Sequence, residues 1–383
     1  MTAPAYDVAI IGAGIVGAAC AREFARSGMS VVVLERDCIG GGATAAGMGH
    51  IVAMDDSEAQ FALTRYSRQL WQELRPELPG DVEYEQRGTI WVAADEEEMA
   101  EVERKHAWYS ARGVATRILN SVELKREEPN LRPVRKDIAG GLLVPEDAVI
   151  FPPCAARFLI DEARTHGAEV ILGCAVTAAG NGRVQTNRKG EIAARAIVNA
   201  AGADSPFLTP GLSVKKRKGH LVITDRYPVF VRHQLVELGY LKSAHSSTTD
   251  SVAFNVQPRC TGQVLIGSSR QYEAEHNEVD RIVLARMIQR AQEYMPAIAD
   301  LAALRTWMGF RAATPDKLPL IGPHQIGSPH EDKTMFLATG HEGLGITTSL
   351  GTARLLADQL LNRKSEIPIE PYLPARQSEP AYA

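Results

Sequence analysis

The sequence contains little cysteine, and no cysteines with the spacing of a metal site. Five cysteines occur among 383 residues, and no two of them form a C-x-x-C motif. Zinc and iron–sulfur sites need clustered thiolates, so the sequence predicts no metal site. An odd number of cysteines is typical of reduced thiols and favours the cytoplasm. The five are Cys20, Cys38, Cys154, Cys174 and Cys260.

Long apolar runs and an excess of charge are also missing. No apolar run approaches the roughly 18 residues that span a membrane, and an apolar strand begins by Tyr6, which leaves no room for a signal peptide. We therefore expect no transmembrane segment. The net charge of −4 and the pI near 6.2 argue against nucleic acid as a partner, because phosphate binding needs clustered positive charge. The one basic run, Lys215–Lys218, is interpreted as a solvated loop.

The most informative motif is at the start of the chain, where an apolar run meets three glycines spaced Gly-x-Gly-x-x-Gly. Gly12 permits a tight strand-to-helix turn, Gly14 lets the backbone approach a pyrophosphate, and Gly17 allows close packing of helix on strand. The apolar strand Val31–Leu34 then delivers Glu35, an acid at the position that hydrogen-bonds a ribose diol. This βαβ unit predicts that FAD or NAD binds here, and not NADP.

The rest of the chain predicts two interleaved domains. Residues 38–50 form a long loop of small residues that is typical of a ligand-lining segment, and Asn199–Gly202 ends a strand on small residues. Strand-like runs between residues 221 and 267 indicate a mostly antiparallel α+β lobe. We predict an α/β Rossmann-like FAD-binding domain with an interleaved antiparallel-sheet substrate domain. The expected ranges are 1–85, 146–212 and 308–370 for the first, 86–145 and 213–307 for the second, and 371–383 for a loose tail.

Near its C-terminal end the chain returns to the pattern of a nucleotide-binding fold. A strand over Met335–Ala338 leads into a glycine-containing loop, and a helix is predicted from Thr347 to Leu361. The N-terminus of such a helix would stabilise a cofactor that becomes anionic on reduction, by about 1 kcal/mol.

These motifs together resemble the D-amino-acid oxidase group of FAD-dependent oxidases and dehydrogenases, especially its glycine oxidase and sarcosine oxidase branch. The resemblance covers nearly the whole length. It is closest to the β subunits of D-hydroxyproline dehydrogenase and archaeal proline dehydrogenase, the B-type subunit of opine oxidase and the C-type subunit of hydrogen cyanide synthase. The motifs that carry it are Gly12–Gly17 with Glu35, Ala46-Gly47-Met48, Asn199–Gly202, Gly309-Phe310-Arg311, Pro319–Gly322 and Gly340–Thr347.

The resemblance implies non-covalently bound FAD, because the cysteine that some relatives bond to the flavin has no clear match here. It also implies which residues hold the cofactor. These are Gly12, Gly14, Ile15, Val16, Gly17, Glu35, Arg36, Gly42, Ala43, Thr44, Ala46, Gly47, Met48, Val176, Ala200, Ala201, Gly202, Gly340, Gly343, Gly345, Ile346 and Thr347.

The resemblance further implies a substrate site on the open face of the flavin, beneath the antiparallel sheet. Arg311 falls where relatives place the arginine that clamps a substrate carboxylate; the alternative is a buried, ion-paired arginine. Met48 and His50 would lie near the flavin ring, and His50 could equally be a histidine of the core. Glu342 and Asn255 replace residues that glycine oxidases use around the substrate, which leaves the substrate class open.

The function implied is oxidation of the Cα–N bond of an amino or imino acid, such as a D-hydroxyproline or proline derivative or an opine. Leu265 stands where sarcosine oxidases carry a lysine that helps oxygen react, so the electrons are expected to pass to a partner redox subunit in a hetero-oligomer, which could place the chain at a membrane surface. Two alternatives stay open. One is a true oxidase that makes hydrogen peroxide, and the other is an FAD-binding structural or electron-relay subunit without substrate chemistry.

Overall fold

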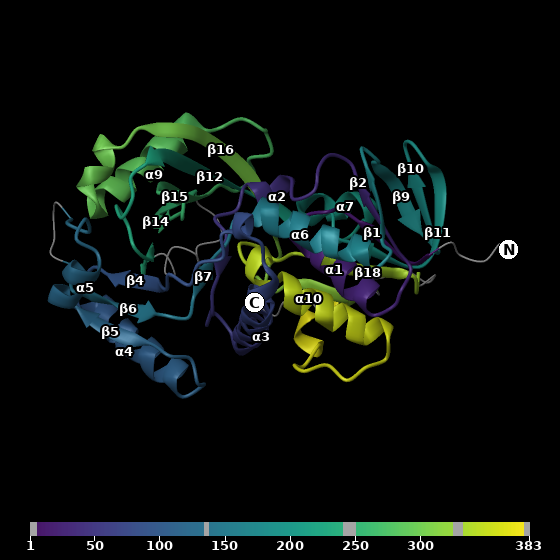
Figure 1. Ribbon diagram of the computed structural model, residues 1–383, viewed down its shortest axis with the longest axis horizontal. Coiled ribbons are helices and arrows are strands. Elements are labelled where there is room, and N and C mark those ends of the chain that lie inside the picture. The colour runs from purple at the N-terminus through teal and green to yellow at the C-terminus, as the bar shows by residue number, and fades with distance from the viewer. Residues whose placement is uncertain (1–5, 134–137, 240–249, 325–331, 379–383) are drawn as a thin grey trace. The chain divides into compact units, whose positions relative to one another are not determined.

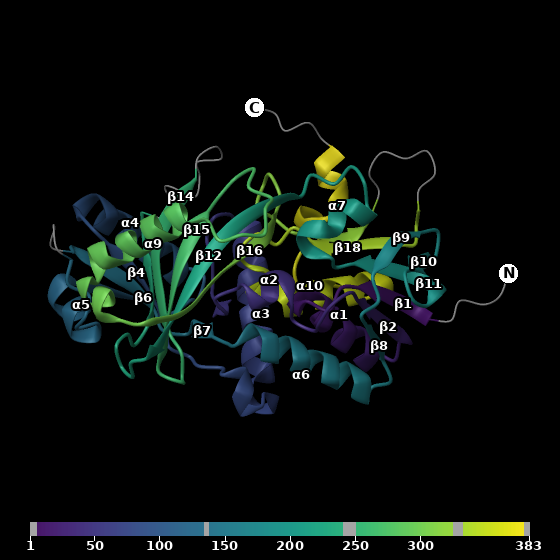
Figure 2. The same ribbon diagram turned by 90° about the horizontal axis from the view of Figure 1, so that it is seen from above.

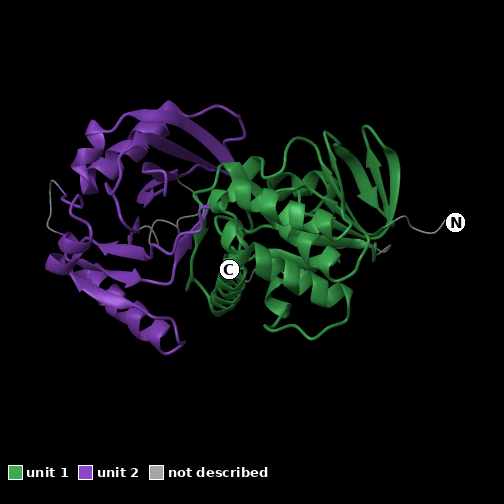
Figure 3. Cartoon of the chain, viewed as in Figure 1, with its two compact units in different colours: residues 1–82, 151–216, 310–383 green, residues 83–150, 217–309 purple. Residues whose placement is uncertain are grey.

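The computed structural model describes residues 6–133, 138–239, 250–324 and 332–378. The chain forms two compact units, each assembled from separate stretches of sequence (Figure 3). Unit 1 comprises residues 1–82, 151–216 and 310–383, and unit 2 comprises residues 83–150 and 217–309.

Unit 1 contains a largely parallel sheet, in which β1 pairs with β11 and β2, and these pair with β18 and β8 (Figure 1). The antiparallel strand β17 closes one edge, and β9 and β10 extend from β11 as an antiparallel meander. In spatial order the strands are β17 (Leu320–Pro323), β18 (Met335–Thr339), β11 (Gly190–Asn199), β1 (Tyr6–Ile11), β2 (Val31–Glu35) and β8 (Glu169–Leu172), with β10 (Arg183–Thr186) and β9 (Val176–Gly180) off this path.

The helices of unit 1 pack mainly around α1, which contacts both α6 and α10, and α10 in turn contacts α3. The α1 helix buries Cys20 and Phe24 on one stripe, as the spacing of its apolar residues predicts. The Ser57 side chain caps α3 by accepting a hydrogen bond from the Gln60 N–H at 3.1 Å. The helices are α1 (Ile15–Arg26), α2 (Gly42–Ala45), α3 (Glu58–Leu74), α6 (Pro152–Thr165), α7 (Ser205–Leu208) and α10 (Gly345–Leu360), and the short strand β3 covers His50–Ile51.

Unit 2 is built on one twisted sheet of eight strands, seen from above in Figure 2. Most neighbours are antiparallel, but β13 and β4 run parallel. In spatial order the strands are β16 (Ala303–Ala313), β12 (Lys215–Arg226), β15 (Gln263–Arg270), β14 (Ser251–Pro258), β13 (Gln234–Glu237), β4 (Thr89–Ala93), β6 (Gly140–Val144) and β5 (Arg117–Asn120).

One face of the unit 2 sheet forms an apolar core with α9. Ile90, Leu235, Phe254 and Val256 belong to this core, and Phe254 stacks on Tyr294 of α9 with ring centroids 4.5 Å apart. Because side chains alternate along a strand, the neighbouring residues point to the opposite face. The remaining elements are α4 (Glu96–Ser110), α5 (Ser121–Glu127), α9 (Arg281–Tyr294) and the short strand β7 (Ala148–Val149).

The basic run Lys215–Lys218 is not the solvated loop that its charge predicts. It begins strand β12, where Lys216 pairs with Asp204 at 3.0 Å and Lys218 is fully buried. The Lys218 Nζ lies 3.2 Å from Nδ1 of His276, and burial lowers the pKa of this lysine. Its tertiary partners explain why charge density alone was misleading.

The C-terminal segment also differs from the loose tail expected over 371–383. Residues 370–372 and 374–378 form short 3-10 helices, and Tyr372 is buried. The Tyr372 hydroxyl donates to the Ala59 carbonyl at 2.6 Å, and Arg376 pairs with Asp316 at 2.6 Å. Residues 379–383 lie outside the described part of the chain.

Candidate functional site

The turn between β1 and α1 has the close backbone contacts that require glycine. Gly12 has φ +101°, and a Cβ there would lie 2.8 Å from the Ala200 carbonyl oxygen. A Cβ on Gly17 would lie only 2.0 Å from the Gly12 oxygen. Gly14 is the N-cap of α1 and provides no side-chain cap. The turn therefore leaves exposed amide groups at a helix N-terminus, the arrangement that binds a phosphate.

The end of β2 is tied to this turn through Glu35. One of its carboxylate oxygens accepts the Ala13 N–H at 2.7 Å, and the other accepts the Asp37 N–H at 2.8 Å. Arg36, next in the chain, pairs with Asp37 at 3.2 Å and with Asp204 at 3.0 Å. The acid thus has a defined position beside the glycine turn, while the charge of Arg36 is matched by protein carboxylates.

The small-residue loop and the N-terminus of α10 are in contact. A Cβ on Gly47 would lie 2.6 Å from Cδ1 of Ile346, so only glycine fits there without displacement. The Thr347 hydroxyl donates to the His50 carbonyl at 2.7 Å. On the other side, Thr44 accepts the Ile15 N–H at 2.9 Å. This loop therefore spans from the start of α1 to the start of α10.

The carboxyl end of β11 lies beside the same turn. The Ala200 N–H donates to the Ile11 carbonyl at 3.0 Å. Asn199 donates to the Ser205 carbonyl at 3.0 Å and its own oxygen accepts the Ala201 N–H at 3.2 Å. Gly202 follows with φ +58°. The strand thus ends on small residues whose backbone is held close to the β1–α1 turn.

The loop before α10 completes the arrangement in unit 1. Gly340 has φ +79°, and a Cβ there would meet Thr314 at 2.6 Å. A Cβ on Gly345 would lie 3.3 Å from Cβ of His341 and 3.9 Å from Val16 on α1, so the two helix N-termini are adjacent. His341 is buried with its Nε2 3.0 Å from the Thr352 hydroxyl, and burial lowers the pKa of His341 to about 3. It is therefore neutral at physiological pH.

Most predicted cofactor residues of unit 1 belong to these five segments, which meet at the carboxyl ends of its parallel strands. Val176 lies apart from them at the start of β9, packed against the core that contains Ile11 and Leu34. The five segments contain Gly12, Gly14, Ile15, Val16, Gly17, Glu35, Arg36, Gly42, Ala43, Thr44, Ala46, Gly47, Met48, Ala200, Ala201, Gly202, Gly340, Gly343, Gly345, Ile346 and Thr347.

Two of the predicted substrate residues are brought together in unit 1. The end of β16 runs antiparallel to the loop before α10, through a bridge between Ala313 and His341 and a 2.8 Å hydrogen bond from the Glu342 N–H to the Ala312 carbonyl. A Cβ on Gly343 would lie 3.8 Å from Nε of Arg311. Arg311 and Glu342 are therefore close to the N-terminus of α10.

The other predicted substrate residues are distributed differently. Met48 and His50 lie in the small-residue segment of unit 1, where the His50 carbonyl accepts the bond from Thr347. Asn255 is on β14 of unit 2 and is buried. Since the two units are described separately, the structure does not bring Asn255 together with Arg311.

Sequence reasoning missed Trp71, which was interpreted only as part of a scaffold helix. Its indole N–H donates to the carbonyls of Ile346 and Thr347, at 3.3 Å and 3.2 Å, and so braces the first turn of α10 from α3. A buried tryptophan with a polar N–H needs a partner, but no spacing in the sequence says which one.

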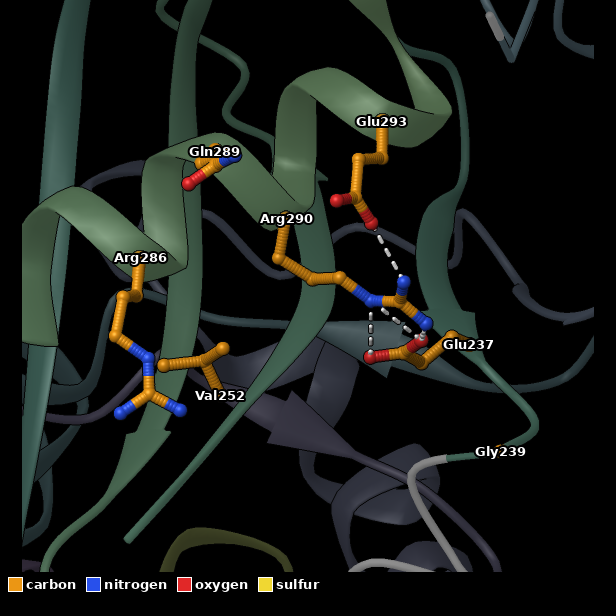
Figure 4. A pocket seen from close by; sticks show the side chains of 7 residues that line it. All are labelled: Glu237, Gly239, Val252, Arg286, Gln289, Arg290 and Glu293. Atoms are coloured by element: carbon orange, nitrogen blue, oxygen red, sulfur yellow. Dashed lines mark hydrogen bonds and ion pairs between the residues drawn. The ribbon is translucent and has the colours of Figure 1, made fainter. Parts of the chain in front are cut away.

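A polar hollow of about 380 Å³ in unit 2 is a different feature. It is lined by α9 and by the end of β13, and Figure 4 shows Arg290 between Glu237 and Glu293 there. Arg290 bonds Glu293 at 2.6 Å and pairs with Glu237, so its charge is already matched. Glu237 lies on the α9 face of the sheet, whereas Asn255 lies on the other. The hollow is therefore separate from the candidate substrate residues.

The residues of unit 1 fit a dinucleotide with a flavin. The glycines leave space where a Cβ would collide, and neither α1 nor α10 has a side-chain cap at its N-terminus. The turn after β1 would hold the pyrophosphate, Glu35 a ribose, and the start of α10 the redox-active ring. Among the described residues, no helix is both long and apolar enough to cross a membrane.

Comparisons with known proteins agree with this geometry. Residues 7–359 match the family described as FAD dependent oxidoreductase (DAO). The chain is 29% identical to the HcnC component of hydrogen cyanide synthase from Pseudomonas aeruginosa, over 98% of this chain and 97% of the relative. It is 27% identical to the D-amino acid dehydrogenase of Vibrio cholerae, over 80% and 71% of the two chains.

Glycine oxidase from Geobacillus kaustophilus is similar in both sequence and structure. Its sequence is 27% identical over 96% of each chain. Its crystal structure matches with a TM-score of 0.84 and 26% identity, covering 97% of this chain and 98% of the other. The predicted fold class and the dependence on FAD are thus confirmed, and the chain belongs to the DAO family of FAD-dependent oxidoreductases.

Proposed function

We propose that this chain oxidises the Cα–N bond of an amino or imino acid, with a secondary amine such as a proline derivative or an opine as substrate. The observation that carries the proposal is the position of Arg311. It lies against the Gly343 loop at the start of α10, the helix that completes the FAD cradle of unit 1. A guanidinium there can hold a substrate carboxylate through two parallel hydrogen bonds.

Arg311 would act by orientation. A carboxylate held by a planar fork loses its rotational freedom, so the α carbon is presented in one direction. Bound FAD supplies, at N5, the acceptor for the hydride that leaves this carbon. The amine nitrogen enters neutral and loses one proton as the imine forms, so no obligatory protein base is needed. The imine is then hydrolysed by water.

We also propose that the electrons leave through a partner subunit. The relative HcnC is by name a subunit of a larger synthase, and Leu265 occupies the position that the family resemblance gives to an oxygen-activating lysine. The five cysteines are free and dispersed, so none of them supplies a second redox centre, and they suit a reducing cytoplasm.

A second candidate is an oxidase that passes electrons directly to oxygen and releases hydrogen peroxide. The similarity to glycine oxidase over 96% of both chains favours it. The two candidates share the substrate chemistry and differ only in what reoxidises the flavin. A third possibility, an electron-relay subunit without substrate chemistry, would bind FAD but reduce it with no amino acid.

The test is anaerobic reduction of the purified FAD-loaded chain by a substrate panel. The panel contains D- and L-amino acids, cyclic imino acids, N-alkylated glycines and opines, and loss of the oxidised flavin absorbance is followed in time. We expect cyclic or N-substituted compounds to bleach the flavin fastest. If dithionite reduces the flavin but no compound of the panel does, the proposed chemistry is wrong.

A further inference from the structure

One face of the unit 2 sheet is unusually polar for a buried surface. Thr89 of β4 lies directly beside Gln234 of β13, and Trp91 lies beside Val236, which is in turn opposite Asn255 of β14. Residues in register on neighbouring strands point to the same face. The residues between them, such as Ile90 and Leu235, belong to the apolar core on the α9 side. The polar side chains therefore gather on the face that turns away from this core.

The polar side chains of this face are buried without hydrogen bonds. Thr89, Gln234, Trp91 and Asn255 have exposed fractions of 0%, 2%, 4% and 7%. Within the described part of the chain, the Thr89 hydroxyl, the Gln234 and Asn255 side-chain oxygens and the Trp91 indole N–H have no hydrogen-bond partner. Leaving such a group unpaired costs about 1–3 kcal/mol, so several together on one face require a partner from outside the protein.

We infer that this patch, defined as Thr89, Trp91, Gln234 and Asn255, binds a neutral hydrogen-bonding substituent of the substrate, such as a hydroxyl or carboxamide group. The inference rests on the proposed function and narrows its substrate class to amino or imino acids that carry such a group beyond the α carbon. The patch offers acceptor oxygens, a hydroxyl and one N–H donor, which match a group that both donates and accepts.

The chemistry of the patch argues against a charged substituent. None of its four side chains is ionisable in the physiological range, and a buried carboxylate or ammonium would require an opposite charge beside it. The nearby cation Lys105 lies over the Trp91 ring, with its Nζ 5.4 Å from the ring centroid. A purely apolar substituent is equally unsuitable, because it would leave the buried polar atoms unpaired.

The experiment compares paired substrates that differ only in the polar group. The pairs are proline with 4-hydroxyproline and alanine with serine, each as D and L isomers, and anaerobic flavin reduction is measured against concentration. The variants are Gln234→Met, Asn255→Leu and Thr89→Val, which keep volume while removing hydrogen-bonding groups. Gln289→Met, on the exposed side of α9, makes the same chemical change outside the patch.

We expect the wild-type chain to prefer the polar member of a pair by about a hundredfold in the second-order rate of reduction. Each patch variant should lower this preference at least tenfold, chiefly by weakening saturation with the polar compound, and Gln289→Met should leave it unchanged. Ligand-induced shifts in Tm should follow the same order. Three variants at separate positions guard against the failure of any one of them to fold.

Two results would overturn the inference and one would overturn its basis. Equal rates with both members of every pair, or equal losses for both members in the patch variants, would show that the patch is structural. A wild-type chain that is reduced by no amino acid at all would refute the proposed function, and the inference would fall with it. Bleaching by any member of the panel separates these cases.

Discussion

At the residue scale, Arg311 can be tested by a change that keeps its charge. Arg311→Lys should weaken substrate saturation by about tenfold or more while FAD content stays near that of the wild type, because an ammonium cannot reproduce the two-bond fork. The measurement is the concentration dependence of flavin reduction together with the flavin-to-protein absorbance ratio. Arg363→Lys, at an exposed position, is the matched control. A parallel loss of flavin would instead make Arg311 a structural residue.

His341 makes a second prediction, on the dependence of stability on pH. Burial lowers the pKa of this histidine from 6.5 to about 3 in the folded chain. Between these values the unfolded chain takes up a proton that the folded chain does not, so stability falls as pH decreases. The loss approaches about 1.4 kcal/mol for each pH unit well below 6.5. Above pH 6.5 this contribution is constant.

The His341→Asn variant should therefore lose less stability than the wild type between pH 6.5 and 5. Urea unfolding at several pH values measures the two slopes, and their difference removes the contribution of the carboxylates. His166→Asn, at an exposed site, provides the comparison for a histidine outside the core. Identical slopes for the wild type and His341→Asn would contradict the assignment of a neutral, buried imidazole.

At the element scale, the C-terminal 3-10 helices should be part of the folding unit. Tyr372 is 1% exposed and donates its hydroxyl to Ala59, next to the first turn of α3. Tyr372→Ala should lower the free energy of unfolding by about 3–5 kcal/mol through the cavity it leaves, and Tyr372→Phe by about 1 kcal/mol. The control is Phe207→Ala, because Phe207 is 72% exposed. Chemical unfolding in which Tyr372→Ala costs no more than this control would show that the tail is dispensable.

At the scale of the whole molecule, the FAD should be held without a covalent bond. The five segments that form the cradle are all parts of unit 1, and their contacts are lost together when that unit unfolds. Acid denaturation followed by filtration should release all of the yellow colour into the filtrate, where chromatography identifies FAD. Flavin that stays with the precipitated protein after this treatment would reveal a covalent link.

The natural electron acceptor is also a property of the whole assembly. If a partner subunit receives the electrons, the isolated chain should turn over slowly with oxygen and quickly with an artificial dye. Oxygen consumption and peroxide formation are measured with the fastest substrate of the panel, in parallel with dye reduction. Rapid oxygen turnover with stoichiometric peroxide would favour the oxidase alternative instead.

Local features of the chain were predictable because they depend on neighbours in sequence. The Gly12–Gly17 spacing, the apolar strand before it and Glu35 after β2 define a βαβ unit whose contacts form within about 30 residues. The helix near the C-terminus was predicted as Thr347–Leu361 and is observed as Gly345–Leu360. Regular periodicity and glycine placement carry this information, since they reflect backbone sterics more than distant packing.

What only the tertiary structure decided depends on segments far apart in the chain. Lys218 reads as a solvated cation until β12 buries it beside His276, and Tyr372 reads as part of a tail until it contacts Ala59. Thr89 and Gln234 are 145 positions apart and become neighbours only through the parallel pairing of β4 with β13. Strand register follows from the packing of the whole sheet, and no local pattern encodes it. The sequence alone determined the nucleotide fold, and the long-range pairing of strands decided which polar groups are buried together.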